Sequence, residues 1–89
     1  MHTYLVEFIG TLFLTFVVLA TGNWLSIGAA LAIAYLLGGP VSGAAYNPAI
    51  ALAYLASGKI TNTDIIPYII AEVAGALIAY ELIKLISYK

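Results

Sequence analysis

One stretch constrains the fold most: a run of small residues that leads into a short apolar helix. Residues 39–49 read Gly-Pro-Val-Ser-Gly-Ala-Ala-Tyr-Asn-Pro-Ala, and an apolar segment follows as far as Ser57. We expect a helix from Pro48 to Ser57, which at 1.5 Å per residue is roughly 15 Å long. A bilayer core is about 30 Å thick. The segment can therefore enter a membrane but cannot cross it. Another protein segment has to cover the remaining half of the bilayer core.

The amino-acid composition indicates that this half-length helix belongs to an integral membrane protein. Of the 89 residues, 64% are hydrophobic and only 8% are charged, with a mean hydropathy of +1.09. A soluble domain of this size would need a more polar surface. The net charge of −1 argues against a nucleic-acid partner. With no cysteine and a single histidine, His2, the sequence predicts one domain without disulfides, metal or cofactor.

The chain is expected to be an all-α membrane protein with three spans and one re-entrant segment. The spans are predicted at about 4–20, 25–38 and 65–87, and the re-entrant loop and half-helix at 39–58. Gly38-Gly39-Pro40 is expected to stop the second span, and Pro67 to fall in the first turn of the third. A signal peptide is a weaker interpretation of the first span, which carries Glu7 and lacks a basic start.

Three spans would place the two termini on opposite sides of the membrane. The N-terminal amine and Lys59 then lie on one side, and Lys84 and Lys89 on the other. Orientation usually follows an excess of basic residues on the cytoplasmic side, but this tally is even. Insertion in both orientations and coincidence both explain it.

The re-entrant loop supplies groups that suit a lumen. The residues Gly43, Ala44 and Ala45 have little or no side chain, so their carbonyl oxygens are candidate acceptors facing a water-filled cavity. Asn47 is expected to cap the half-helix with its side-chain oxygen, with Pro48 at the first helical position. Its amide NH₂ then points outward, at the positive end of the helix. Such a site binds water or a hydroxyl and repels cations. A packed loop without a lumen is the alternative.

Three separated motifs resemble the aquaporin (major intrinsic protein) family. They are Glu7-Phe8-Ile9-Gly10-Thr11, the loop from Ser42 to Ala49, and Ile70-Ala71-Glu72-Val73-Ala74-Gly75, where the family usually has Gln in place of Glu72. The resemblance covers nearly the whole chain but only one of the family's two inverted repeats. It implies a passive channel for water or small neutral solutes, with Asn47, Pro48 and Ala49 lining the pore.

Two departures from the family shape the expected assembly and selectivity. The absent second repeat favours an inverted homodimer as the pore unit in membrane lipid, and the family's tetramer would make four such units. The arginine that usually follows the second Asn-Pro-Ala is replaced by Ile50. By resemblance the selectivity filter would consist of Tyr35, Ala44 and Ile50. Such an uncharged filter makes glycerol and ammonia plausible permeants beside water.

The two carboxylates within predicted spans are functional candidates, because an ionisable group in a membrane is costly. The resemblance gives Glu7 a scaffold role, in which it accepts hydrogen bonds from backbone N–H groups of the loop. Glu72 is expected to do the same or to lie near the membrane interface. No nucleophile accompanies them, so an enzyme is not expected. The sequence leaves open an accessory subunit that pairs with a full-length relative without conducting. A proton pathway through the two carboxylates is a weaker alternative.

Overall fold

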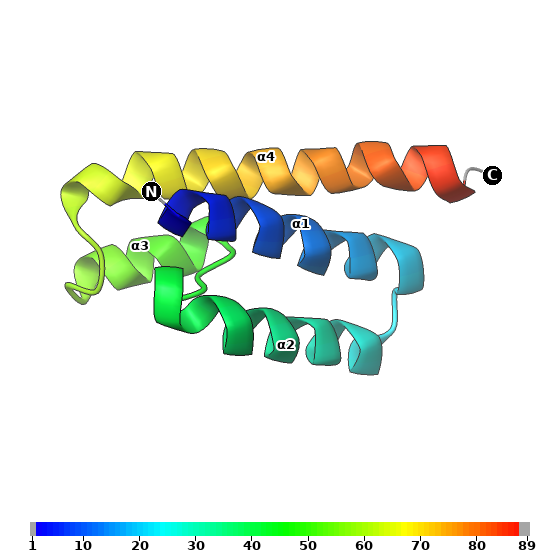
Figure 1. Ribbon diagram of the computed structural model, residues 1–89, viewed down its shortest axis with the longest axis horizontal. Helices are drawn as coiled ribbons and strands as arrows, with labels where there is room; N and C mark the ends of the chain where they lie inside the picture. Colours follow the sequence, from blue (N-terminus) through cyan, green and yellow to red (C-terminus); the bar gives the residue numbers. More distant parts are fainter. Residues whose placement is uncertain (1, 88–89) are drawn as a thin grey trace.

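The computed structural model describes residues 2–87 and shows four helices (Figure 1). Met1, Tyr88 and Lys89, the last of which entered the charge tally, lie outside the described residues. The helices are α1 (His2–Thr21), α2 (Trp24–Ser42), α3 (Pro48–Ala56) and α4 (Asn62–Ser87). The all-helical architecture expected from the sequence is confirmed.

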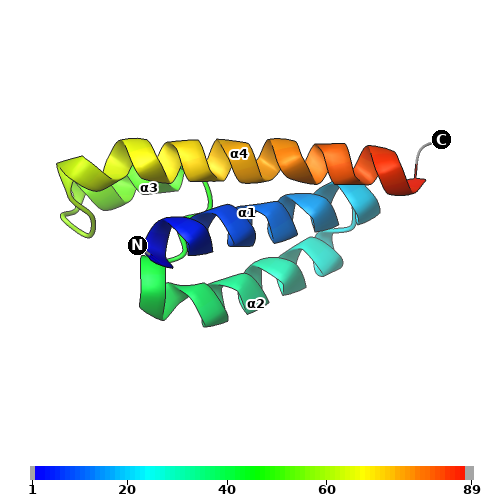
Figure 2. The ribbon, with the colours of Figure 1, turned by 45° about the horizontal axis from the view of Figure 1, so that its top comes forward.

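The three long helices run side by side along the long axis, and α3 occupies only one end of it (Figures 1 and 2). The helix α1 packs against both α2 and α4, and α3 packs against α4. The described part of the chain measures 43 × 23 × 20 Å. The start of α1 and the end of α4 lie at opposite ends of the long axis (Figure 1), which is the arrangement that the predicted three crossings would give.

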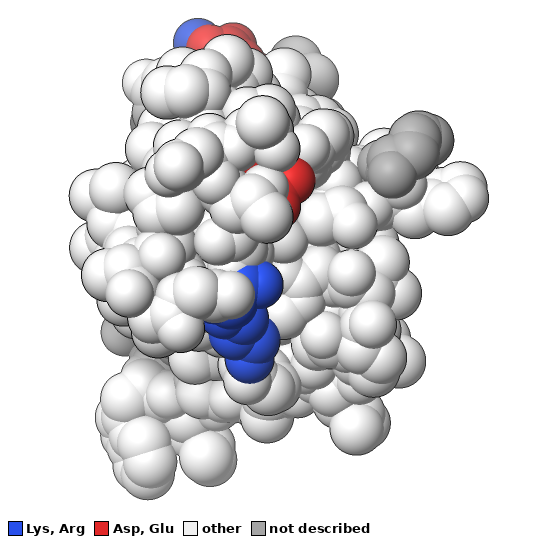
Figure 3. All heavy atoms as spheres, turned by 90° about the vertical axis from the view of Figure 1, so that its left-hand side faces the viewer, with Lys and Arg blue, Asp and Glu red and all other residues white. Residues whose placement is uncertain are grey.

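The helices differ in whether they are long enough to cross a membrane. Among residues 2–87, α1 and α2 are long and apolar enough to cross a membrane. The helix α4 has 26 residues, which is about 39 Å, and its crossing stays a prediction. The helix α3 has nine residues, or about 14 Å, so it reaches about halfway through a bilayer core. Large apolar side chains are exposed along all four helices, and Figure 3 shows how few charged atoms interrupt the surface at the end near α3.

Close packing of α1 on α4 depends on Gly75. A Cβ atom built on Gly75 would lie 2.5 Å from the carbonyl oxygen of Phe8 and 3.1 Å from the backbone nitrogen of Leu12. Any side chain at this position would meet backbone rather than a movable side chain. Gly75 therefore lets the two helices approach closely.

The end of α2 corrects one expectation from the sequence. The helix passes through Gly38-Gly39-Pro40 and ends only at Ser42, with its last turn inclined to the rest of the helix (Figure 1). A proline near a helix end removes one backbone hydrogen bond without forbidding the next turn. The signal that ends α2 is Gly43, whose φ of 82° is left-handed and whose N–H donates to the Gly39 carbonyl.

The start of α4 corrects a second expectation. The helix begins at Asn62, so Pro67 lies beyond the first turn. Hydrogen bonds between Thr61 and Asp64 explain the earlier start. The Thr61 backbone N–H and hydroxyl both donate to Asp64 Oδ2, which is one half of a capping box, and the Asp64 N–H donates to the Thr61 carbonyl. The hydrogen bond from Thr61, followed by one from the Tyr4 hydroxyl, lowers the pKa of the Asp64 carboxyl. This group precedes the predicted span at 65–87.

Candidate functional site

Asn47 caps the half-helix α3 and keeps a free donor. Its backbone is extended, with φ −160° and ψ 127°, which the following proline favours. Its Oδ1 accepts from the Ala49 N–H at 2.7 Å. The Asn47 side chain is exposed, and its amide NH₂ donates to no group within residues 2–87. The arrangement presents a fixed amide donor at the positive end of a helix.

The loop before α3 holds two residues other than glycine in the left-handed region. They are Ala44, with φ 52°, and Tyr46, with φ 55°. Such conformations cost about 1 kcal/mol or more each and persist only where surrounding contacts fix them. Both residues are buried, so the loop is a packed part of the fold.

Glu7, on α1, accepts several of the hydrogen bonds that hold this loop in its conformation. Its Oε1 accepts from the Tyr46 N–H at 2.8 Å, and its Oε2 accepts from the Ala45 N–H at 3.1 Å and the Ser42 hydroxyl at 2.6 Å. The Ser42 hydroxyl oxygen in turn accepts from the Ala44 N–H. Three consecutive loop N–H groups therefore depend on this fully buried carboxylate, directly or through Ser42. These are the backbone hydrogen bonds that the resemblance implied for Glu7.

Tyr46 is a buried wedge between α1 and α2. Its hydroxyl donates to the Ala34 carbonyl at 2.8 Å. Its ring occupies the space that side chains would need at Gly10 and Gly38, where an added Cβ would lie 2.1 Å and 1.9 Å from ring and hydroxyl atoms. Gly10 thus accommodates a tyrosine from the loop.

The three candidate lumen carbonyls differ in their partners. Gly43 O accepts from the Tyr54 hydroxyl at 2.9 Å, which leaves one of its two lone pairs. The Ala44 and Ala45 carbonyl oxygens accept no hydrogen bond within residues 2–87. Their role at a lumen stays a prediction.

Two loop-holding tyrosines were not found from the sequence. The Tyr54 hydroxyl binds Gly43 O, and the Tyr68 hydroxyl donates to Ser42 O at 2.6 Å. The available signal was that a tyrosine within an apolar segment needs an acceptor for its hydroxyl, but the sequence does not name that acceptor.

The candidate filter residues occupy two environments. The side chains of Tyr35 and Ile50 are 48% and 43% exposed. Ala44 is 3% exposed and packs with Ala34 and Tyr46, so its methyl group does not share a surface with the other two within one chain. A filter made of these residues stays a prediction.

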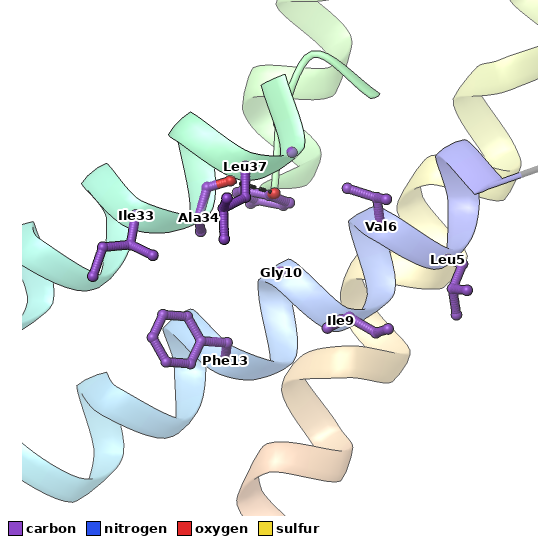
Figure 4. Close-up of a pocket in the computed structure, with 10 residues that line it drawn as sticks. Leu5, Val6, Ile9, Gly10, Phe13, Ile33, Ala34 and Leu37 are labelled. Carbon is purple, nitrogen blue, oxygen red and sulfur yellow. Dashed lines mark hydrogen bonds between the residues drawn. The ribbon is translucent and has the colours of Figure 1, made fainter. Parts of the chain in front are cut away.

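A groove of about 470 Å³ lies between α1 and α2, above the Tyr46 ring. Figure 4 shows side chains from both helices converging on it, among them Phe13, Ile33 and Leu37. Its lining is almost entirely apolar. A path for water needs acceptors and donors along its wall, so this groove is not a candidate solute path.

Glu72 lies beside the loop anchor. It is 1% exposed within the chain, and its position relative to the membrane interface stays a prediction. Its carboxyl faces the Glu7 carboxyl and the Asn47 backbone N–H, but neither oxygen forms a hydrogen bond within residues 2–87. In the same range no three His, Cys, Asp or Glu side chains gather into a metal-binding group.

The chain is similar to known membrane channel proteins. The sequence profile described as major intrinsic protein matches residues 1–89. A protein of Lactiplantibacillus plantarum described as "Glycerol uptake facilitator protein-like 6" is 42% identical over 94 residues, covering 94% of this chain and 43% of the relative. "Aquaglyceroporin AqpS" of Rhizobium meliloti is 41% identical over 55 residues, covering 62% of this chain and 24% of the relative. The chain thus spans less than half the length of these relatives. No solved structure matches it.

Proposed function

Because the chain belongs to the major intrinsic protein family, we propose that it forms a passive channel for water and small neutral solutes such as glycerol or ammonia. The family consists of membrane channels, not enzymes, and both relatives carry names that refer to glycerol or to aquaglyceroporins. The observation that carries the proposal is the exposed Asn47 amide at the start of α3.

The Asn47 side chain is suited to selecting a neutral, hydrogen-bonding solute. Its oxygen is occupied by the Ala49 N–H, so only its NH₂ group can meet a permeant, and it meets that permeant as a donor. A water or hydroxyl oxygen accepts from this group. A cation does not, and it is also repelled by the partial positive charge of about half a unit at the helix N-terminus.

The pore unit in this proposal is an inverted pair of half-helices. The nine residues of α3 cover about 14 Å of a core about 30 Å thick, so a second half-helix must cover the rest. A second copy of the chain inserted the opposite way supplies it and brings two Asn47 amides together near the midplane. The even distribution of basic groups supports insertion in both orientations. Four such dimers would form the full assembly.

An uncharged filter at each mouth completes the proposal. The chain contains three basic residues, all of them lysines, so no arginine narrows the pore. Tyr35 and Ile50, exposed in one chain, would line the mouths, and the Ala44 and Ala45 carbonyls would accept from permeating hydroxyl groups. Glycerol and ammonia, as well as water, fit such a lining.

Osmotic shrinkage of proteoliposomes tests the channel. We expect permeability to water and glycerol above that of lipid alone, and a clear loss of solute permeation or of cation exclusion in Asn47→Asp. Asn23→Asp is the matched control, because Asn23 caps α2 in the same way, through the Ser26 N–H, at the α1–α2 turn. Permeability no higher than that of empty liposomes would refute the channel. Equal behaviour of the two variants would remove Asn47 from the pore.

Labelling of single cysteines tests the inverted pair separately. A cysteine placed near Lys59 and another placed near Lys89 should each react from both sides of the membrane. Reaction of each from one side only would refute the inverted homodimer. One-sided labelling would instead favour pairing with a different chain, and the non-conducting accessory role is one form of such pairing.

A further inference from the structure

Glu72 is the most costly unpaired group in the described part of the chain. Within residues 2–87, the buried side-chain polar atoms without a hydrogen bond are Thr11 Oγ1 and the two carboxyl oxygens of Glu72. The Glu72 side chain is 1% exposed, so bulk solvent does not reach it. An unpaired carboxylate in such surroundings is far more costly than a neutral carboxyl group.

The neighbours of Glu72 determine which of two adjacent carboxyls is charged. Glu7 accepts from three donors, the Ser42 hydroxyl and the Ala45 and Tyr46 N–H groups, so both of its carboxyl oxygens are used as acceptors. Glu72 has no such donors and faces the Glu7 carboxylate. Two carboxylates that share a buried site do not both ionise. The pair therefore holds one proton, and that proton belongs on Glu72.

A protonated Glu72 fits both of its polar neighbours. A carboxylic acid has one O–H donor and one carbonyl acceptor. Glu7 is an acceptor, and the Asn47 backbone N–H is a donor with no hydrogen bond elsewhere within residues 2–87. An ionised Glu72 would satisfy Asn47 but would repel Glu7.

We propose that Glu72 is a protonated positioning residue that joins the Glu7 anchor on α1 to Asn47, the N-cap residue of the half-helix α3. In this protonated form the O–H group has the Glu7 carboxylate as its neighbouring acceptor, and the C=O group has the Asn47 N–H as its neighbouring donor. The protonated Glu72 carboxyl then helps to anchor the re-entrant loop, in addition to the hydrogen bonds that Glu7 accepts. Removing this proton at alkaline pH places two negative charges under the loop and loosens the start of α3. The inference concerns the anchoring of the loop and holds whether or not the chain conducts.

No other group near Glu72 takes over this proton. The elements packed against α4 are α1 and α3. The Tyr4 hydroxyl of α1 donates to Asp64, and the Tyr54 hydroxyl of α3 donates to Gly43 O. On α4 itself, Tyr68 donates to Ser42 O, and Glu81 pairs with Lys84 at 3.0 Å on the exposed surface.

Glutamine at position 72 is the informative substitution. Its amide has an NH₂ donor for Glu7 and a C=O acceptor for Asn47, in nearly the shape of the protonated acid, but it cannot lose a proton at accessible pH. Glu72→Leu keeps a similar volume and removes both polar groups. Glu81→Gln removes a carboxyl from the same helix where it is exposed, and is the matched control.

Two measurements on the purified chain in detergent test the proposal, and neither depends on conduction. In infrared spectra of chain labelled with carbon-13 glutamate, the band of a protonated carboxyl should be present at neutral pH in the wild type and Glu81→Gln, and absent in Glu72→Gln. In unfolding measurements, Glu72→Gln should match the wild type at neutral pH, and Glu72→Leu should be less stable. Tyrosines and lysines titrate in every variant, so the result is the difference between variants. On raising the pH, the wild type and Glu81→Gln should lose stability relative to Glu72→Gln.

Several results would overturn the proposal. A wild type without the protonated-carboxyl band at neutral pH, or a band that persists in Glu72→Gln, would show that the proton is not on Glu72. Parallel pH profiles of the wild type and Glu72→Gln would show that no titration of this group loosens the loop. A Glu72→Gln variant that fails to fold, or a Glu72→Leu variant as stable as the wild type, would refute the positioning role.

Discussion

Replacing Gly10 with alanine places a methyl group where the Tyr46 ring now lies. The added Cβ would stand 2.1 Å from Cε1, 2.4 Å from Cζ and 2.8 Å from Cδ1 of that ring. Carbon atoms in favourable contact are about 3.5–4.0 Å apart, so the ring would have to move by more than about 1 Å. The Tyr46 hydroxyl bond to Ala34 and the left-handed Tyr46 backbone oppose this movement.

The expected loss of stability follows from three terms. Overpacking a well-packed site costs about 1–3 kcal/mol. Loss of the buried bond from Tyr46 to the Ala34 carbonyl adds about 1 kcal/mol. Alanine is a better helix former than glycine by about 1 kcal/mol, which offsets part of the cost. We therefore expect Gly10→Ala to lower the free energy of unfolding by about 2 kcal/mol.

Unfolding in mixed detergent micelles, followed by circular dichroism, measures this difference. Gly28→Ala is the control, because a Cβ added at Gly28 in α2 meets no atom within 4 Å beyond the adjoining residues and backbone of its own helix. It should be neutral or stabilising by up to about 1 kcal/mol. A double-mutant cycle with Tyr46→Ala should show that the methyl group at position 10 costs little once the ring is gone. Equal effects of the two glycine substitutions, or additive effects in the cycle, would refute the wedge role of Tyr46.

Two further predictions concern other parts of the fold. Gly75→Ala should destabilise the chain by about 3 kcal/mol, because its methyl group meets the Phe8 carbonyl oxygen. An unfolding midpoint like that of the wild type would contradict this close approach. Hydrogen bonds from Thr61 and Tyr4 lower the pKa of Asp64 below its usual value of 3.8, so its ionised form stabilises the fold at neutral pH and this contribution is lost as the pH falls below about 4. In Asp64→Asn, the free energy of unfolding should fall less as the pH is lowered below about 4. The same loss in this variant as in the wild type would show that Asp64 is not its cause.

The sequence predicted the number and type of elements because local signals mark them. The apolar runs gave the long helices, and Asn47 before Pro48 gave the start of the half-helix. The boundaries of α2 and α4 were wrong by a few residues. Proline disfavours a helix only at one backbone bond, so Pro40 and Pro67 were tolerated inside helices, whereas Gly43 and the Thr61–Asp64 pair set the actual ends.

The site was only partly predictable. Asn47 capping depends on a contact two residues away along the chain, so spacing alone indicates it. The bond from Tyr68 to Ser42 spans 26 positions and that from Glu7 to Tyr46 spans 39. For Glu7 only the resemblance to a family indicated the partner. For Tyr54 and Tyr68 nothing in the local sequence did.

The sequence by itself determined that this chain is an apolar, all-helical protein with one helix too short to span a bilayer, because length and hydropathy are properties of each segment alone. Only the tertiary structure decided what holds that short helix in place. Packing α1 against α4 buries Glu7 and Glu72 beside one loop. In that interior, out of reach of water, each donor and acceptor depends on the side chain that folding brings next to it.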